Sequence, residues 1–577
     1  MPEPGERARR GSALVVALAG AVMLPFVVAA VRVALIKHGY ATASDLSIIE
    51  LRIRDIPLHP PLVGPYSRYG WNHPGPAIYY ALAPLYWLAS RESVGLLWGA
   101  LTINCAACVG TVVVARRRGG LALAGAAAVA MLVFLHGFGA ANALSTWNPT
   151  LPVMPLVLFL ALAWSVAVGD AALLPWCALV GSFVAQAHVG LDLTVLVAAG
   201  FAATSMGVRW RRGHVRVSRS VLRLSAVVMV AMWAGPAIDA LAHRGGNARA
   251  LVHYFRGKHQ RIGFPEAWHI VSGELSVNAQ WFRGFVRDPF TAEPFSAYHN
   301  HAPLLLVVLL LAVALSTRQR GAGTMPALLL SIATTVAAVV SIASITGVAY
   351  DYLSTWVSAV AVFSTIAVAA VALVELRRRR PQWVRAVVGT LAVAALIAAA
   401  FGIRQSATFA DPSDAAAHLV VRAARVVARS PDVRHGTVMV TPLAGLESGL
   451  AGAGMLFHLE DLGVKIGVPA NEAFVYGGHR VARDSSHALL FGVSVVEHAS
   501  QVPKVRPGMQ LVVRLDELSP SARARYDGFA VALSRLIAQH RYNDVARLGP
   551  VPHGGGILTV WRLHDPRLAP HDSFLGA

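Results

Sequence analysis

The sequence predicts an α-helical polytopic membrane protein of about eleven spans, N-terminus inside and C-terminus outside, followed by a C-terminal extracytoplasmic α/β domain. Of the 577 residues, 55% are hydrophobic and only 14% are charged, which is more apolar surface than one or two water-soluble cores can bury. Long apolar windows alternate with short clusters of Arg, and near Asp411 the composition changes to that of a soluble domain. We therefore place the protein in the cell membrane as a multi-pass protein.

Each apolar window is assigned by requiring every Arg cluster to lie inside, as the positive-inside rule demands. The expected spans are residues 12–34, 94–115, 121–140, 151–168, 172–187, 193–208, 221–241, 303–315, 325–346, 352–373 and 384–401. The stretch 74–89 is short and contains three prolines, so we interpret it as a re-entrant or interfacial helix. The net charge of +20 lies in these loop clusters rather than on one amphipathic face, so no nucleic-acid binding is predicted.

The predicted domains are a transmembrane domain, 1–404, with outer loops 37–93 and 242–302, and a soluble α/β domain, 405–577. Within the soluble domain, residues 438–440, 488–496, 511–515 and 557–563 have the pattern of strands, and 446–462 and 519–540 that of amphipathic helices. Only the outer side receives enough polar chain to build a site. The chemistry is therefore expected there.

The first outer segment carries acidic residues soon after the first span, beginning with Asp45 and Glu50, and then the motif His73-Pro74-Gly75-Pro76 leading into an amphipathic helix. This arrangement resembles the C superfamily of multispanning glycosyltransferases, which includes the protein O-mannosyltransferases and the lipid A aminoarabinose transferases. Asp45 matches the superfamily's first acidic position. Gly75 stands where many members have a second proline.

The resemblance implies a glycosyltransferase that moves a sugar from a polyprenyl-phosphate donor to a glycan, lipid or protein acceptor of the cell envelope. Membrane lipid is then a further partner. Two alternatives of other classes are a transporter or flippase of a lipid-linked glycan and a non-catalytic envelope-assembly protein. A transporter is expected to show repeat-related halves and helices broken at the midplane, and the spans show no such pairing.

A transferase of this kind needs a carboxylate as general base for the acceptor hydroxyl and cations or amides to hold the departing phosphate. Asp45 or Glu50 is the candidate base. The candidate substrate-binding residues are Arg52, Arg54, Arg68, His73, Asn148, His188, Lys258 and Asp351. The three cysteines lie in apolar windows, so no metal site is predicted and the cofactors remain unknown.

Structural interpretations compete with these roles. Asp45 could cap a helix over 46–54, and Glu50 could form a surface pair with Arg54 four residues on. His73 could serve only as a helix-entry residue, and Arg68 could stack on neighbouring aromatic rings.

Two further expectations concern the outer loops. Residues 245–255 have the pattern of a helix lying in the membrane interface, where it could gate a lipid donor. The soluble domain contains no phosphate loop or nucleophile elbow, so we expect it to orient the acceptor and to pack over the outer loops.

Overall fold

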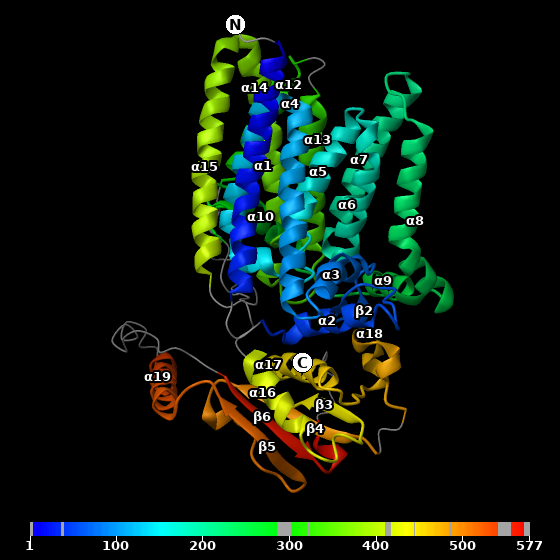
Figure 1. Cartoon of the computed structure of the whole chain (residues 1–577), viewed down its shortest axis with the longest axis vertical. Coiled ribbons are helices and arrows are strands. Elements are labelled where there is room, and N and C mark those ends of the chain that lie inside the picture. Colours follow the sequence, from blue (N-terminus) through cyan, green and yellow to red (C-terminus); the bar gives the residue numbers. More distant parts are fainter. Residues whose placement is uncertain are drawn as a thin grey trace. The chain divides into compact units, whose positions relative to one another are not determined.

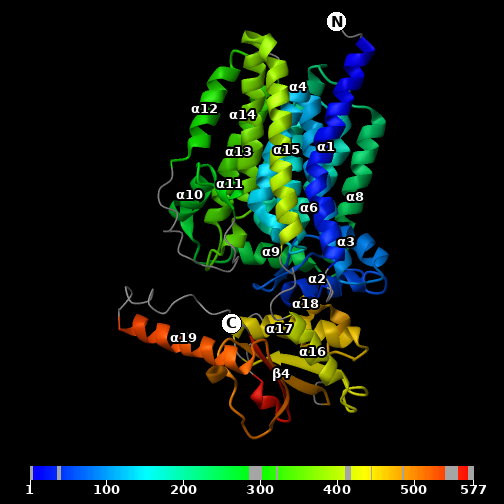
Figure 2. The same ribbon diagram turned by 60° about the vertical axis from the view of Figure 1, so that its left-hand side comes forward.

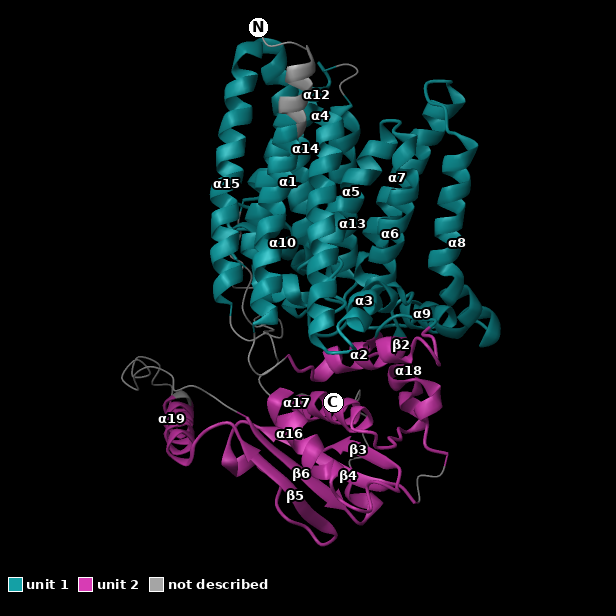
Figure 3. Ribbon diagram, viewed as in Figure 1, with its two compact units in different colours: residues 1–37, 62–65, 72–410 teal, residues 38–61, 66–71, 411–577 magenta. Residues whose placement is uncertain are grey.

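The computed structural model describes residues 4–35, 40–284, 302–319, 323–409, 417–443, 445–483, 487–539 and 556–569. Two compact units share the chain (Figure 3). The membrane unit comprises residues 1–37, 62–65 and 72–410, and the C-terminal unit comprises 38–61, 66–71 and 411–577. This division differs from the predicted domains in two respects: 38–61 and 66–71 group with the C-terminal segment, and the boundary lies after residue 410 instead of after 404. Of the predicted loop 242–302, residues 285–301 lie outside the described residues.

The membrane unit is a bundle of helices that run mostly parallel or antiparallel (Figures 1 and 2). Its main helices are α1 (Pro4–Ala34), α3 (Ala77–Leu88), α4 (Val94–Leu144), α5 (Val153–Ala167), α6 (Leu174–Ala187), α7 (Asp192–Arg211), α8 (Arg219–Ala242), α9 (Gly246–Arg256), α10 (Gly263–Glu274), α11 (Gln280–Arg283), α12 (Leu304–Ser316), α13 (Thr324–Ala343), α14 (Val357–Arg379) and α15 (Val384–Thr408). By length and composition, seven helices among the described residues can cross a membrane. The number of spans and their orientation stay predictions.

Each predicted span coincides with a helix, and α4 contains two of them. Gly120 has φ 74° and ψ −161°, which breaks the helical path inside α4. The Asn104 side chain donates to the Ala143 carbonyl at 2.9 Å, although a straight helix would separate residues 39 positions apart by about 58 Å. Therefore α4 is a helical hairpin that turns at Gly120, directly after Arg116–Arg118.

The turn of this hairpin shares one end of the bundle with other basic loops. Asp170, after α5, forms ion pairs with Arg117 at 2.8 Å and Arg118 at 3.2 Å. Arg209, near the end of α7, donates to the Ala167 carbonyl at 3.0 Å. The helical packing thus gathers at one end the clusters that the positive-inside rule assigns to the inner side.

Helix α3 follows the His-Pro-Gly-Pro motif and has 12 residues, about 18 Å of helix axis. Its exposed side chains include Tyr80 and Trp87, each 42% exposed. Aromatic side chains of this kind favour the membrane interface. Whether the helix is re-entrant or interfacial stays a prediction.

The C-terminal unit contains a four-stranded sheet in the order β3-β4-β6-β5. Its strands are β3 (Val438–Pro442), β4 (Leu489–Val496), β5 (Met509–Asp516) and β6 (Ile557–Leu563). β3 is parallel to β4, whereas β6 is antiparallel to both β4 and β5. The larger helices are α16 (Ala417–Ala428), α17 (Gly445–Asp461) and α19 (Pro520–Ala538). The strands and helices predicted from periodicity are found within a few residues of their expected bounds.

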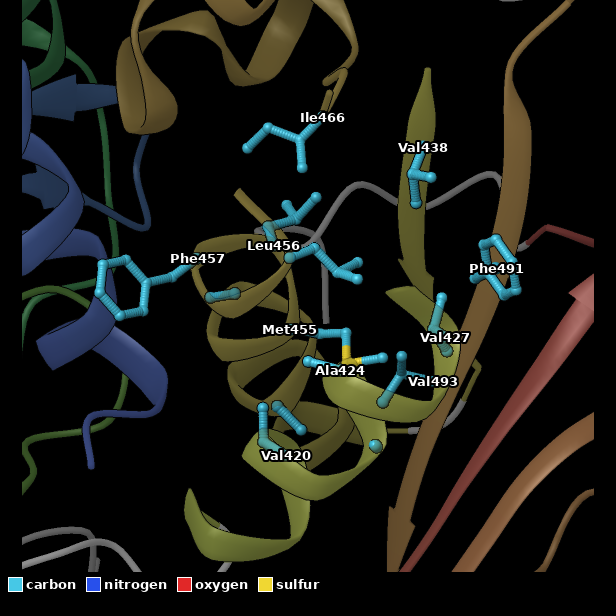
Figure 4. Close-up of a cluster of buried hydrophobic side chains, with 14 of the residues drawn as sticks. Val420, Ala424, Val427, Val438, Met455, Leu456, Phe457, Ile466, Phe491 and Val493 are labelled. Atoms are coloured by element: carbon cyan, nitrogen blue, oxygen red, sulfur yellow. The ribbon is translucent and has the colours of Figure 1, made fainter. Parts of the chain in front are cut away.

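The core of this unit lies between the sheet and helices α16 and α17, as Figure 4 shows. Helix α2 (Ser44–Asp55), from the first outer segment, contributes Ile48 and Leu51 to the same core; they are 2% and 1% exposed. Phe457 of α17 points toward α2, and the Arg54 guanidinium lies 5.4 Å from its ring centroid. Part of the first outer segment and the C-terminal segment thus share a core.

Candidate functional site

Asp45 lies in the first turn of α2, and its carboxylate accepts a hydrogen bond from the Tyr66 hydroxyl at 2.5 Å. The N-cap position belongs to Ala43, so the interpretation of Asp45 as the helix cap is wrong. Ser44, the preceding residue, has φ 56°, a left-handed conformation that costs energy for a residue other than glycine. Strain of this kind is concentrated at functional sites. The half-buried Asp45 therefore has the position expected of a reactive carboxylate.

Glu50 has a different environment, because it is buried at 1% exposure and accepts from the Thr42 hydroxyl at 2.6 Å. The Thr42 carbonyl in turn accepts from the His458 ring at 2.9 Å, and burial lowers the pKa of His458. Arg54 pairs with Asp461 at 3.0 Å. The interpretation of Glu50 and Arg54 as a surface pair is therefore wrong, since the carboxylate is inside the fold.

Asp55, the last residue of α2, is the centre of an ion cluster. Arg480 donates to its two carboxylate oxygens at 2.7 and 2.9 Å, and Arg52 donates at 2.7 Å. The His479 ring lies 3.4 Å from the same carboxylate and stacks on His59 with ring centroids 3.9 Å apart. The predicted substrate-binding residue Arg52 thus contacts a carboxylate of its own helix. Asp55, which accepts from both arginines, holds much of the cluster together.

Helix α18 (Ala473–Tyr476), from the C-terminal segment, packs against α2. Its last residue, Tyr476, is buried; burial, and then the charges of Glu472 and Asp45, raise the pKa of its hydroxyl. Glu472 itself is 8% exposed. The helix that carries Asp45 is therefore covered in part by the C-terminal segment.

Arg68 is exposed and lies over the ring of Tyr69, with its guanidinium carbon 5.1 Å from the ring centroid. Its guanidinium also donates to the Tyr69 hydroxyl at 3.2 Å. The structural interpretation of Arg68 as a stacked cation is confirmed. Because Arg68 is exposed, its role in substrate binding stays a prediction.

In the membrane unit, the rings of His73 and His188 lie next to each other, with centroids 4.5 Å apart and planes tilted by 31°. The Nδ1 atom of His73 accepts from the Val189 amide at 3.0 Å, and that of His188 accepts from the Gly190 amide at 3.1 Å. Burial lowers the pKa of both rings, to about 4 for His188, and the neighbouring His188 further lowers that of His73. With Nδ1 as acceptor in a neutral ring, each Nε2 carries the proton and is a donor.

Gln186, two residues before His188, connects the start of α3 to α8. Its side-chain oxygen accepts from the Ala77 amide at 3.2 Å, at the start of α3, and its side-chain nitrogen donates to the Met232 carbonyl at 2.6 Å. A Cβ atom added at Gly75 would come 2.2 Å from the same side-chain oxygen. The glycine that departs from the superfamily motif therefore leaves room for the buried Gln186.

Asn247, in the first turn of α9, fixes the residue before His73. It accepts from the Asn72 amide and donates to the Asn72 carbonyl, both at 2.7 Å. Asp239 of α8 accepts from the Asn247 amide at 2.7 Å. These contacts tie the His-Pro-Gly-Pro motif to the start of the helix expected in the membrane interface.

The remaining candidates lie in loops of the membrane unit. Asn148 is buried and donates to the Ala187 carbonyl at 3.4 Å, next to His188. Lys258 is exposed just after α9, where the Ile262 amide pairs with the Ile345 carbonyl at 3.0 Å. Asp351 begins a short 3-10 helix that follows this pairing. The structure thus places Asn148 beside His188, and Lys258 on the loop that pairs with the segment before Asp351.

Glu274, at the end of α10, is a residue that sequence analysis missed. It is 6% exposed, and burial raises its pKa to about 8, with the charge of Asp351 adding to the rise. Its Oε2 atom has no hydrogen-bond partner among the described residues. Nothing in the sequence around it distinguished Glu274 from an ordinary loop carboxylate.

Among the described residues, no group of three or more His, Cys, Asp or Glu side chains has the geometry to hold a metal ion. The candidate site residues predicted from the sequence divide between the two units. Asp45, Glu50, Arg52, Arg54 and Arg68 belong to the C-terminal unit, and the others belong to the membrane unit.

Comparison with solved structures identifies a similar fold. No protein-family model and no curated protein sequence matches the chain. The crystal structure of ArnT from Cupriavidus metallidurans bound to undecaprenyl phosphate is similar with a TM-score of 0.52, at 13% identity, over 97% of this chain and 99% of that one. The apo state of ArnT gives 0.48, at 13% identity, over 98% and 100%.

The archaeal oligosaccharyltransferase AglB from Archaeoglobus fulgidus, in complex with an inhibitory peptide and a dolichol-phosphate, gives 0.48, at 10% identity, over 95% of this chain and 88% of that one. ArnT and AglB are both members of the C superfamily. The likeness to ArnT, over nearly the whole of both chains, shows that this chain has the fold of that protein.

Proposed function

We propose that this protein is a membrane glycosyltransferase that moves a sugar from a polyprenyl-phosphate donor to a glycan, lipid or protein acceptor on the extracytoplasmic side. The observation that carries the proposal is the shared fold with ArnT, which was crystallised with undecaprenyl phosphate, over nearly the whole of both chains. The placement of Asp45 at a strained turn, in the segment where the superfamily carries its acidic residues, supports it.

Asp45 is the general base of the proposed reaction. Its carboxylate takes the proton of an acceptor hydroxyl while that oxygen attacks the anomeric carbon of the sugar. The bond between this carbon and the phosphate oxygen breaks, and its electron pair leaves with the polyprenyl phosphate. Phosphate leaves as a stable anion, so no acid has to protonate it. A single displacement of this kind inverts the anomeric configuration.

Glu50 is the weaker candidate for the base. Its carboxylate is buried at 1% exposure and is engaged by Thr42, whereas Asp45 is half-buried. An acceptor hydroxyl must come within hydrogen-bond distance of the base. We therefore assign Glu50 to holding the chain before α2 in place.

The donor phosphate needs hydrogen-bond donors and positive charge. His73 and His188 offer Nε2 protons, and Lys258 offers an exposed ammonium group beside the interfacial helix α9. Along α9, Val252 and Phe255 are exposed apolar residues and Arg249 and Arg256 exposed basic ones, the pattern of a helix at a lipid surface. Arg52 and Arg54, in contrast, pair with Asp55 and Asp461, so we assign them to stabilising α2.

Undecaprenyl phosphate is the probe that tests the donor side. Native mass spectrometry of the full-length protein in detergent should show one bound molecule, which competes with the farnesyl-phosphate esters of mannose, glucose, arabinose and aminoarabinose. At least one radiolabelled ester should be transferred to membrane extract or to water, and Asp45→Asn should stop the transfer. Absence of lipid-phosphate binding together with absence of turnover for every ester would overturn the proposal.

A further inference from the structure

We propose that Arg480 is a positioning residue for this reaction, because it holds helix α2, and with it Asp45, through Asp55. This inference rests on the proposed function, and it assigns to the C-terminal segment a part in catalysis that acceptor binding alone does not cover. It concerns contacts within the C-terminal unit only.

All five N–H groups of the Arg480 guanidinium have acceptors. Two go to the carboxylate oxygens of Asp55, at 2.7 and 2.9 Å, and two go to those of Glu460, at 2.6 and 2.7 Å. The fifth goes to the Tyr476 carbonyl at 2.7 Å. The side chain of Arg480 is 5% exposed, and that of Asp55 is 4%. Its acceptors lie in three helices, α2, α17 and α18, so the guanidinium has a fixed orientation. The end of α2 that it binds is therefore fixed as well.

Helix α2 transmits this constraint to Asp45. The helix spans Ser44–Asp55 without an internal glycine or proline, so Asp45 and Asp55 move together as parts of one rigid helix. The two residues are about 15 Å apart along its axis. Ile48 and Leu51 anchor its middle in the core. A tilt at Asp55 therefore displaces Asp45, and a displacement of about 1 Å can cost about 100-fold in rate.

The strained backbone in the first turn of α2 requires such a constraint. Ser44 at φ 56° persists only if the surrounding structure holds the helix start in place. The same C-terminal segment that carries Arg480 also carries helix α18, which packs against α2 and ends at Tyr476. Gly477, at φ 94°, lets this segment approach, since a Cβ there would come 2.4 Å from the Arg52 guanidinium.

The test compares Arg480→Lys, Asp55→Asn and the double variant with a matched control, Arg523→Lys, in the full-length protein. Arg523 is also a buried arginine of the C-terminal unit, bound to the Asp516 carboxylate at 2.8 Å. Turnover of the best farnesyl-phosphate ester, Tm and hydrogen exchange of the α2 amides are measured for each. Lysine at position 480 keeps the positive charge but cannot form the bidentate hydrogen bonds to the two carboxylates.

Arg480→Lys and Asp55→Asn should each lower kcat about 100-fold and leave KM for the donor within about threefold. The double variant should be no worse than the stronger single variant, because both act through one contact. Exchange at α2 should rise in these variants and stay unchanged in Arg523→Lys, whose kcat should stay within about twofold even where its Tm falls equally.

Three results would overturn the inference: full activity of Arg480→Lys, a kcat that falls equally in Arg523→Lys, and α2 exchange that is unchanged in Arg480→Lys. Failure of the proposed function is distinguishable from all three. An active Asp45→Asn removes Asp45 as the base, whereas an inactive Asp45→Asn with a fully active Arg480→Lys leaves the base in place and removes only the positioning role.

Discussion

The carboxylate of Asp55 accepts two hydrogen bonds from the guanidinium of Arg480, which lies 425 positions further along the chain. The helix that carries the candidate base therefore belongs to a fold completed by the last third of the sequence. This changes the role expected for the C-terminal segment. A domain that only oriented the acceptor could be removed with donor chemistry intact, but its removal here exposes Ile48 and Leu51 and leaves Asp55 without its main partner.

The first prediction concerns the general base. Asp45→Asn should lower kcat about 10²- to 10⁴-fold, the usual contribution of a positioned base, while Tm and undecaprenyl phosphate binding stay unchanged. Tyr66→Phe, which removes one hydrogen bond to Asp45, should cost about tenfold. Kinetics of donor-ester turnover measure both. A normal rate for Asp45→Asn with an inactive Glu50→Gln would move the base to Glu50.

The second prediction concerns stability. Arg480→Ala leaves the Asp55 and Glu460 carboxylates without their shared partner, so it should destabilise the fold by about 3–5 kcal/mol. Arg567→Ala serves as the control, because Arg567 is 87% exposed in its pair with Asp565 and should leave stability almost unchanged. Thermal unfolding in detergent compares the two. Equal effects would mean that the buried cluster contributes no more than a surface pair.

The third prediction is a pH dependence caused by the adjacent histidines. Burial lowers the pKa of His73 and His188 in the folded state, to about 4 for His188, against 6.5 for a free ring. The unfolded chain then binds more protons below pH 6.5, so the stability that the two neutral rings contribute is full above that pH and is lost as the pH falls toward the folded-state pKa values. By pH 5.5, one unit below the free value, the loss from His188 should be about 1.4 kcal/mol.

Thermal unfolding between pH 7.5 and 4.5 measures this loss. His188→Gln should flatten the curve in that window, whereas His214→Gln, at an exposed loop position, should leave it unchanged. A wild-type curve that rises as the pH falls would show that the pair is charged in the folded protein.

The fourth prediction concerns orientation in the membrane. A membrane-impermeant thiol reagent should label Arg429→Cys from outside and Arg378→Cys only after the membrane is opened, since both positions are exposed. The native cysteines give little background, because Cys108 and Cys177 are buried and Cys105 is half-buried. The reverse pattern would invert the topology and with it the side on which the reaction is placed.

The helices and strands were predictable because local sequence patterns determine them. Hydrocarbon requires long apolar helices, and Arg clusters separate them, so every expected span lies on a helix. Alternating apolar residues predicted β3 to β6 within a few positions. Even the turn inside α4 is marked in the sequence, since Gly119 and Gly120 follow three arginines.

The partners in the site could not be predicted, because they depend on tertiary contacts between distant residues. Asp55 and Arg480 are 425 positions apart, so their contact exists only in the folded chain. The pair Gly477-Gly478 before His479 was the one available sign of a close backbone approach, and glycine pairs are too common to interpret alone. Glu274 gave no sign, because its burial depends on α10 and α11 folding against the bundle.

Gly75 provides the last prediction, since it is the departure from the superfamily motif. Its missing Cβ leaves space for the Gln186 side chain, which cannot easily move away, because it is fully buried and bonded to both the Ala77 amide and the Met232 carbonyl. Gly75→Ala should therefore lower Tm by several degrees, an effect of about 1–3 kcal/mol typical of overpacking. Gly75→Ala combined with Gln186→Ser should recover part of this loss, because the shorter side chain vacates the space. If the second substitution only adds to the destabilisation, the clash with Gln186 is not the reason for glycine at this position.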